Sequence, residues 1–106
     1  MGEPERPTQF ELNVPQELEG GVYANVLGVW HTVYEFTLDF AAMQPPQVLD
    51  EADPASPAVV PCRVVSRVKV PVTVVFDLIR ALNENMTKYE ERFGEIRRPG
   101  DGHEHA

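Results

Sequence analysis

Cysteine is almost missing from this chain of 106 residues, because Cys62 is the only one. A lone cysteine cannot form a disulfide within its own chain, so a fold held together by disulfides is excluded. The first residues also lack the basic segment and apolar run of a secretory signal peptide. From these absences we expect a cytoplasmic protein.

Long apolar runs and basic residues are also scarce. Asn25, His31, Glu35 and Asp39 interrupt the most hydrophobic region, which therefore falls short of the roughly 20 apolar residues that cross a bilayer. Seventeen acidic residues against nine basic ones give a formal charge of −8. That charge repels phosphate backbones and anionic lipid surfaces at long range, so we expect no membrane partner, and nucleic acid is disfavoured as a partner.

Sequence signatures of catalysis are missing too, because there is no glycine-rich phosphate loop, no zinc-ligand spacing and no nucleophile motif. Glu35 and Asp39 fall on one face of an expected strand. Four residues along a strand separate them by about 13 Å, beyond the roughly 5 to 9.5 Å between the two carboxylates of glycoside hydrolases. We interpret both as residues of a solvated face.

The remaining reactive side chains have no partners in the sequence pattern. We interpret His31 as a turn residue and Cys62, which has no base beside it, as a small core residue. His103 and His105 lie in a glycine-flanked tail without a scaffold that could hold a metal. The sequence thus predicts no catalytic, cofactor-binding or metal-binding residue, no cofactor, and a protein that is not an enzyme.

What the sequence does contain is one small domain. Residues 1–9 carry two prolines and alternating charges, which predicts a disordered N-terminal arm, and residues 97–106 resemble a disordered tail. Residues 10–96 then form a single domain. Near its beginning, Phe10, Leu12 and Val14 alternate with polar residues in the manner of a short edge strand, and Gly20 with Gly21 marks a turn.

Two β-strands are expected over residues 22–30 and 34–40, joined as an antiparallel hairpin by residues 31–33. In the second strand every other residue is apolar and is expected to face the core, namely Tyr34, Phe36, Leu38 and Phe40. The residues between them are expected to face solvent: Glu35, Thr37 and Asp39.

A proline-rich and acidic stretch at about residues 44–60 follows, and it predicts a mobile loop without regular strand pairing. Strand character returns at residues 62–70, where Arg63, Arg67 and Lys69 are expected to point one way. Cross-strand pairs with the acidic face of residues 34–40 would neutralise them.

A long helix is expected from Pro71 to Phe93, with Gly94 as its C-terminal cap. The residues that follow Pro71 are β-branched and lose side-chain freedom in a helix, so a strand that continues over residues 71–75 remains an alternative.

Along this helix the large apolar residues recur at intervals of four and three. They are Val75, Ile79, Leu82, Met86, Tyr89, Phe93 and Ile96. Beyond Asn83 this stripe narrows to a seam spaced for packing of one helix on another. The helix would span about 34 Å against roughly 23 to 31 Å for the strands, so its last turns would overhang a small sheet.

The stripe predicts the interface of a homodimer or higher oligomer. Its expected residues are Ile79, Leu82, Met86, Tyr89 and Phe93. The alternative is a monomer in which the helix crosses its own sheet diagonally and its last aromatic residues pack on the segment that precedes the first strand.

Three blocks together resemble a known family: FELNVPQELEGGVYANVLGVWHTVYEFTLDF, CRVVSRVKVP and LIRALNENMTKYEERFGEI. The chain is similar, over about residues 10–96, to short bacterial and archaeal proteins known only as a domain of unknown function. The resemblance implies no catalytic residue. Such sequences usually open the helix with a polar cap, whereas Pro71 and Val72 leave this first turn without one. A looser similarity is to the SecB export chaperones, which are acidic and join an antiparallel meander to an oligomerising helix.

We therefore expect an α+β fold, a small antiparallel meander of about three to four strands followed by one long C-terminal helix. The leading hypothesis is a non-enzymatic, homo-oligomeric binding or adaptor module with a protein or peptide partner. The first alternative is a SecB-like chaperone that binds extended peptides. A further alternative is nucleic-acid binding through five basic residues: Arg63, Arg67, Lys69, Arg97 and Arg98.

Overall fold

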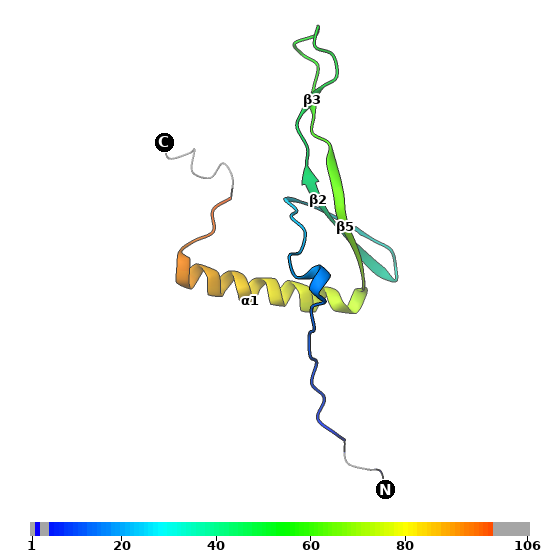
Figure 1. Cartoon of the computed structure of the whole chain (residues 1–106), viewed down its shortest axis with the longest axis vertical. Helices are drawn as coiled ribbons and strands as arrows, with labels where there is room; N and C mark the ends of the chain where they lie inside the picture. The colour runs from blue at the N-terminus through cyan, green and yellow to red at the C-terminus, as the bar shows by residue number, and fades with distance from the viewer. Residues whose placement is uncertain (1, 3–4, 99–106) are drawn as a thin grey trace.

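The computed structural model describes residue 2 and residues 5–98, and it consists of an antiparallel sheet followed by one long helix (Figure 1). The sheet has the strand order β1-β2-β5, with β1 at Val26–His31, β2 at Glu35–Met43 and β5 at Cys62–Pro71. A 3-10 turn, η2 (Val72–Val74), leads into α1 (Val75–Phe93). The predicted α+β class is confirmed. Within the described residues, no helix has the length and apolar character needed to cross a membrane.

The hairpin of β1 and β2 forms as predicted, with small shifts in its bounds. Its turn is closed by the backbone of Thr32, whose N–H donates to the carbonyl of Glu35 at 2.9 Å. The Thr32 hydroxyl accepts from the N–H groups of Tyr34 and Glu35, both at 3.2 Å. Tyr34 therefore lies exposed in the turn, not on the core face that its place in the alternation predicted. The first strand begins at Val26, later than residue 22.

Pairing of β2 with β5 is interrupted by a β-bulge. Phe40 lies opposite Ser66, but the next residue, Ala41, lies opposite Val64, so Val65 is the extra residue. An inserted residue breaks the alternation of its strand, so side chains on the two sides of the bulge no longer keep the faces that their sequence spacing predicts. Arg63 consequently lies opposite Ala42, on the Phe40 side, and not on one face with Arg67 and Lys69 as predicted.

The proline-rich stretch is more regular than predicted. β3 (Gln47–Val48) and β4 (Ala58–Val59) pair antiparallel and carry the hairpin of β2 and β5 outward beyond the sheet (Figure 1). Its tip is fixed by short-range polar contacts, since the Ser56 hydroxyl accepts from the Asp50 N–H at 3.0 Å and Asp53 accepts from the Ala55 N–H at 2.9 Å. Asx turns of this kind order a loop that composition alone suggests is irregular.

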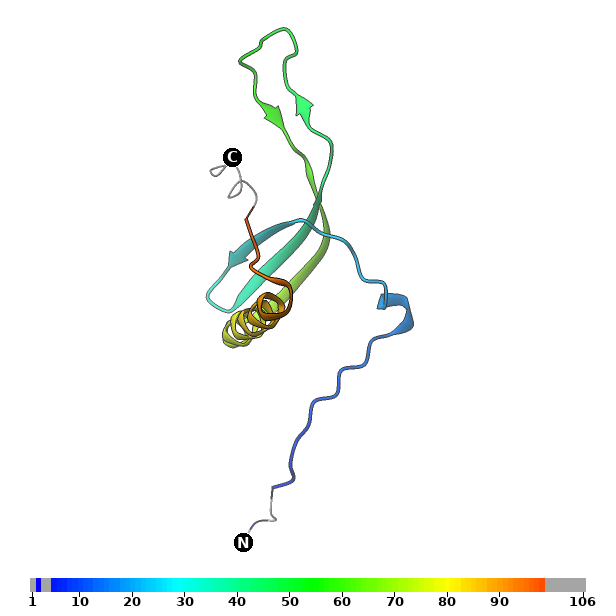
Figure 2. The same ribbon diagram turned by 90° about the vertical axis from the view of Figure 1, so that its left-hand side faces the viewer.

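The region before β1 contains only one short element, η1 (Gln16–Leu18). The expected turn forms at Gly21, whose φ of 66° lies in the left-handed region. Residues 10–14, a possible edge strand in the sequence, pair with no strand among the residues that the structure describes. They run away from the sheet and the helix (Figure 2).

The two ends of the helix turn out differently. β5 continues through Pro71 and α1 begins at Val75, so the alternative of a continued strand holds at Pro71 and the helix starts later than predicted. The residue that precedes α1, Val74, offers no side-chain cap. At the other end Gly94 caps the helix as predicted, with φ 97° and its N–H donating to the Glu90 carbonyl at 2.9 Å.

Most of the predicted tail, residues 99–106, and part of the predicted arm, residues 1 and 3–4, lie outside the described residues.

The core of the described chain is thin. Its only buried residues are Thr37, Leu38, Asp39 and Ala41, all on β2, and none of its large side chains is completely buried. A single chain with so little enclosed apolar surface leaves most of its hydrophobic side chains in contact with water.

Candidate functional site

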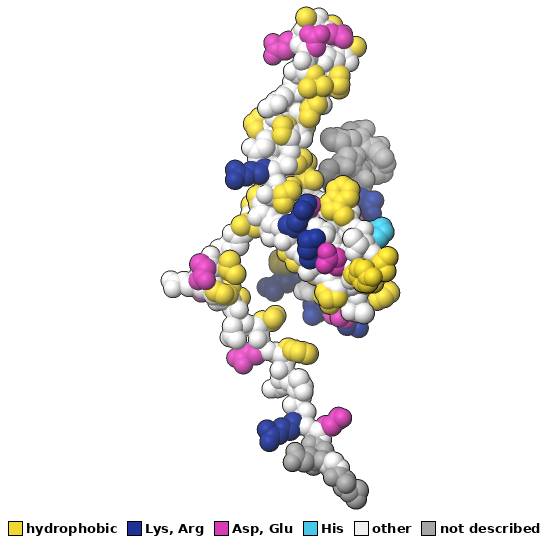
Figure 3. Space-filling view, turned by 90° about the vertical axis from the view of Figure 1, so that its right-hand side faces the viewer, with side chains coloured by type: hydrophobic (Ala, Val, Ile, Leu, Met, Phe, Trp, Pro, Cys, Tyr) yellow, Lys and Arg dark blue, Asp and Glu magenta, His cyan; other side chains and the backbone are white. Residues whose placement is uncertain are grey.

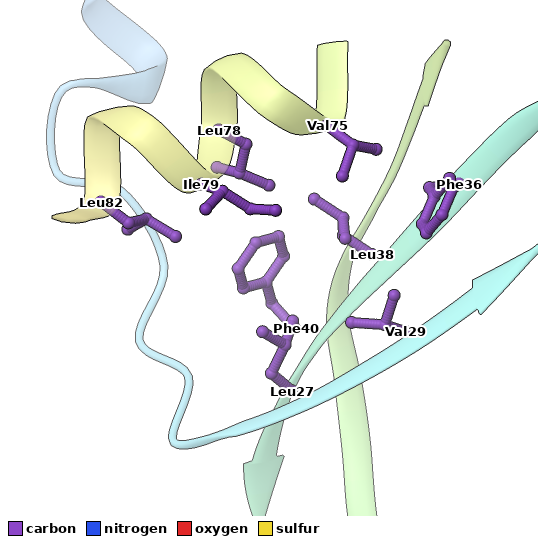
Figure 4. Close-up of a pocket in the computed structure, with 9 residues that line it drawn as sticks. All are labelled: Leu27, Val29, Phe36, Leu38, Phe40, Val75, Leu78, Ile79 and Leu82. Carbon is purple, nitrogen blue, oxygen red and sulfur yellow. The ribbon is translucent and has the colours of Figure 1, made fainter. Parts of the chain in front are cut away.

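An apolar cavity of about 430 Å³ lies between the sheet and the first half of α1 (Figure 4). We call it the apolar groove. Its lining is entirely hydrophobic and comes from three elements: Leu27 and Val29 from β1, Phe36, Leu38 and Phe40 from β2, and Val75, Leu78, Ile79 and Leu82 from α1.

Two periodicities bring these side chains together. In a strand every second residue shares a face, which places Phe36, Leu38 and Phe40 on the side of the sheet toward the helix. In a helix, residues three or four apart share a face, which directs Ile79 and Leu82 back toward the sheet (Figure 4). The predicted core face of residues 36–40 is thus the floor of the groove.

The groove is open, however, and its walls are only partly covered. Leu27 and Leu82 are each 56% exposed, Ile79 is 51% exposed and Val29 is 49% exposed. Contiguous apolar surface of this kind marks a binding or association surface in a folded protein. The arrangement can hold an apolar occupant by exclusion of water, but it presents no side-chain donor or acceptor to one.

The apolar surface continues along the second half of the helix. We define the helix seam as Leu82, Met86, Tyr89 and Phe93, all of which are exposed. The rings of Tyr89 and Phe93 lie 5.0 Å apart, and the Arg92 guanidinium lies 5.3 Å from the centre of the Phe93 ring. Of the five predicted interface residues, the structure places Ile79 and Leu82 in the groove and leaves the other three exposed further along α1.

Sequence reasoning missed the contribution of β1 to this surface. Leu27 and Val29 form one wall of the groove, but the stretch around them is apolar on both sides. The one signal in the sequence is that Leu27 and Val29 flank Gly28 and so share one face of the strand. Which face of β1 turns toward the helix is decided only by the register of β1 with β2.

The opposite face of the sheet carries polar side chains, two of which are buried. Thr37 and Asp39 are only 9% and 6% exposed, so the prediction that they face solvent is wrong. The indole of Trp30 reaches across Gly28 to Asp39, and its Nε1 donates to Oδ2 at 3.0 Å. Neighbouring side chains on β1 and β5 thus shield these residues from water.

The predicted cross-strand neutralisation is confirmed at two of the three basic residues. Arg67 binds Asp39 with two hydrogen bonds, Nε to Oδ1 at 2.6 Å and Nη2 to Oδ2 at 2.8 Å. Lys69 donates to Glu35 Oε1 at 3.1 Å and to Thr37 Oγ1 at 3.4 Å. The basic residues therefore do not form one free cationic patch.

The Asp39 carboxylate is engaged on both oxygens. The hydrogen bonds from Arg67 lower its pKa below the usual range, against the effect of burial, which raises it, and the Trp30 hydrogen bond lowers it further. The charged carboxylate accepts two hydrogen bonds from Arg67 on β5 and one from Trp30 on β1. Asp39 therefore connects the three strands of the sheet. Every buried side-chain nitrogen and oxygen in the described part of the chain has a hydrogen-bond partner.

The other candidate side chains are not brought together. Cys62 is exposed at the start of β5, so its interpretation as a core residue is wrong. His31 ends β1 and stacks on Phe36 with ring centres 5.5 Å apart. His103 and His105 lie outside the described residues. Within residue 2 and residues 5–98, no three His, Cys, Asp or Glu side chains gather in a way that could hold a metal ion.

Comparison with known proteins places the chain in a family. Searches of the curated proteins and of the solved structures gave no significant match, so the similarity to SecB gains no support from a shared fold. A family model described as "Protein of unknown function (DUF3467)" matches residues 1–98, which is nearly the whole chain. The match covers both the groove and the helix seam, and the chain therefore belongs to the DUF3467 family.

Proposed function

We propose that this protein is a non-enzymatic binding module that works as a homo-oligomer, with the apolar groove and the helix seam as its association surface. The observation that carries the proposal is the open groove, whose walls on β1 and α1 remain about half exposed. A second copy that covers this face would complete the core.

The free energy available from this surface is large enough to matter. Full burial of an apolar side chain stabilises by about 1.5 to 3 kcal/mol, so each half-exposed side chain of the seam and groove walls can still contribute roughly 1 kcal/mol. In a two-fold symmetric dimer every such contribution occurs twice. A small domain gains proportionally more from this than a large one, because its own core supplies only a few kcal/mol.

The proposal is tested by a charge placed within the seam. Met86→Glu would bury a carboxylate in a desolvated contact, which costs several kcal/mol unless the contact opens. We expect sedimentation equilibrium at micromolar concentration to show a dimer or larger species for the wild type and a monomer for this variant. Circular dichroism should show that the strands of the variant persist.

Thr87→Glu is the matched control, because it adds the same charge one residue along the helix and away from the seam. It should remain associated. A wild-type chain that sediments as a monomer would contradict the proposal, as would full association of Met86→Glu.

The chaperone alternative is favoured by one specific observation. β1 is an outer strand of the described sheet and borders the apolar groove, so an extended peptide could pair with its backbone while placing side chains in the groove. In that case fluorescence anisotropy should detect binding of unrelated extended apolar peptides. Binding of such peptides with no self-association would favour the chaperone over the oligomeric module.

A further inference from the structure

Residues 8–14, with the sequence TQFELNV, form a second unpartnered apolar feature of the chain, which we call the leading segment. It lies between Pro7 and Pro15. Its apolar residues alternate with polar ones as in a strand that is buried on one face. Phe10 is 95% exposed and Leu12 is 94% exposed, so this apolar face is almost uncovered by the described part of the chain.

The outer edge of β1 is the feature of the fold that matches this segment. In the described part of the chain β1 pairs only with β2, so the backbone N–H and C=O groups along its other edge have no strand partner. β1 is six residues long, and seven residues lie between the two prolines of the leading segment. Proline stops ladder pairing, so both ends of such a strand are set by the sequence.

We propose that the leading segment of one copy adds as a strand to the outer edge of β1 in a second copy, and this inference rests on the homo-oligomer proposed above. Phe10, Leu12 and Val14 would then lie on the groove side, beside Leu27 and Val29 of the other chain. Paired backbone groups would provide the affinity, and the alternating side chains would fill the open side of the groove. Exchange of an identical segment between copies is a low-cost route to a dimer.

The geometry points to a second copy and not to the segment's own chain. η1 and the turn at Gly21 direct the leading segment away from its own β1 and sheet (Figure 2). Figure 3 shows the same segment extending from the body with hydrophobic side chains along it. In this conformation the edge available to the segment belongs to another molecule.

The surface involved is of the size that stable dimers need. A buried Phe contributes roughly 150 to 250 Å², and two-fold symmetry doubles the contribution of every residue of the segment. A standard interface buries about 1,200 to 2,000 Å² in total. Two exchanged strands together with two helix seams can bury a total area within that range. The seams alone would leave the apolar residues of the groove walls and of the leading segment exposed.

The experiment uses cross-linking between differently tagged chains. In a Cys62→Ser background, one tagged chain carries Leu12→Cys and the other carries Val29→Cys, each at an apolar position that the proposal places on the groove side. After the two chains are mixed and allowed to exchange, a short bifunctional maleimide should give a covalent heterodimer. A Leu12→Cys chain mixed with an Ala52→Cys chain, whose cysteine lies on the hairpin tip, should give little.

A pair of substitutions tests the same contact through affinity. Leu12→Asp places a charge on the groove side of the added strand, and the dimer should weaken roughly tenfold or more. Asn13→Asp adds the same charge on the opposite side of the strand and should change the dissociation constant little.

The outcomes separate this inference from the function on which it rests. A further chain carries both Leu12→Cys and Val29→Cys. A cross-link within that chain, with none between the mixed single-cysteine chains, would overturn the inference in favour of closure on the chain's own β1. A dimer with no heterodimeric cross-link and no effect of Leu12→Asp would overturn it and leave the homo-oligomer standing. A monomeric wild-type chain would overturn both.

Discussion

At the scale of single residues, the polar contacts of Asp39 organise the sheet. Its carboxylate joins Trp30 on β1 to Arg67 on β5, so one side chain on the central strand ties together all three strands of the sheet. The neighbouring pair of Glu35 and Lys69 is more exposed, and exposed ion pairs contribute only about 0 to 1 kcal/mol. Asp39 is therefore the polar residue of the sheet whose loss matters most.

We predict that Asp39→Asn lowers the free energy of unfolding at neutral pH more than Glu35→Gln does, and that the Asp39→Asn difference from wild type shrinks in acid. The pKa of Asp39 is depressed in the folded state, so its contribution is present above the unfolded pKa and is lost as the pH falls through the folded pKa. Urea unfolding at neutral and acidic pH measures this difference. A difference that stays constant with pH would show that the charge of Asp39 plays no part.

At the scale of elements, the end of α1 depends on one backbone conformation. Gly94 has φ 97° and ψ 172°, a combination that is open almost only to glycine. The chain then turns back, so that the Ile96 N–H donates to Oε2 of the Glu90 side chain at 3.0 Å. The last turn, which carries Phe93 of the helix seam, is thereby held in place.

Gly94→Ala should accordingly destabilise the protein by about 1 to 3 kcal/mol, because alanine is strained in this region of the backbone. Gly20→Ala is the control, since an added Cβ there meets no atom within 4 Å and its φ is not in the left-handed region. Thermal unfolding followed by circular dichroism would compare the two. Equal melting temperatures for the two variants would contradict the argument.

At the scale of the whole molecule, charge and apolar surface act in opposite directions on association. Two copies that each carry a formal charge of −8 repel each other, while the groove that we expect them to bury is lined only by apolar side chains. Salt screens the repulsion and leaves the apolar contribution in place.

We therefore predict that the dissociation constant of the oligomer decreases as the salt concentration rises from roughly 0.05 to 0.5 M. Over this range the Debye length falls well below the dimensions of the interface. Sedimentation equilibrium across this range would measure the dissociation constant. Dissociation at the higher salt concentration would instead indicate an interface held by ion pairs, and would place the association surface away from the apolar groove.

The sequence by itself determined the features that depend on neighbours along the chain. The strand alternation of residues 36–40, the four-and-three rhythm of α1, the turn at Gly21 and the cap at Gly94 all follow from local spacing and backbone preference. For the same reason the helical half of the candidate site, Ile79, Leu82, Met86, Tyr89 and Phe93, could be predicted before any fold was known.

Only the tertiary structure decided which surfaces meet. The bulge at Val65 moved Arg63 to the other face, and no local pattern reveals how two strands align across a long hairpin. The register of β1 placed Leu27 and Val29 in the groove wall, and Trp30 covered an Asp39 that alternation alone assigned to solvent. Burial depends on partners that are distant in the chain, and the spacing of residues along a strand or helix does not contain that information.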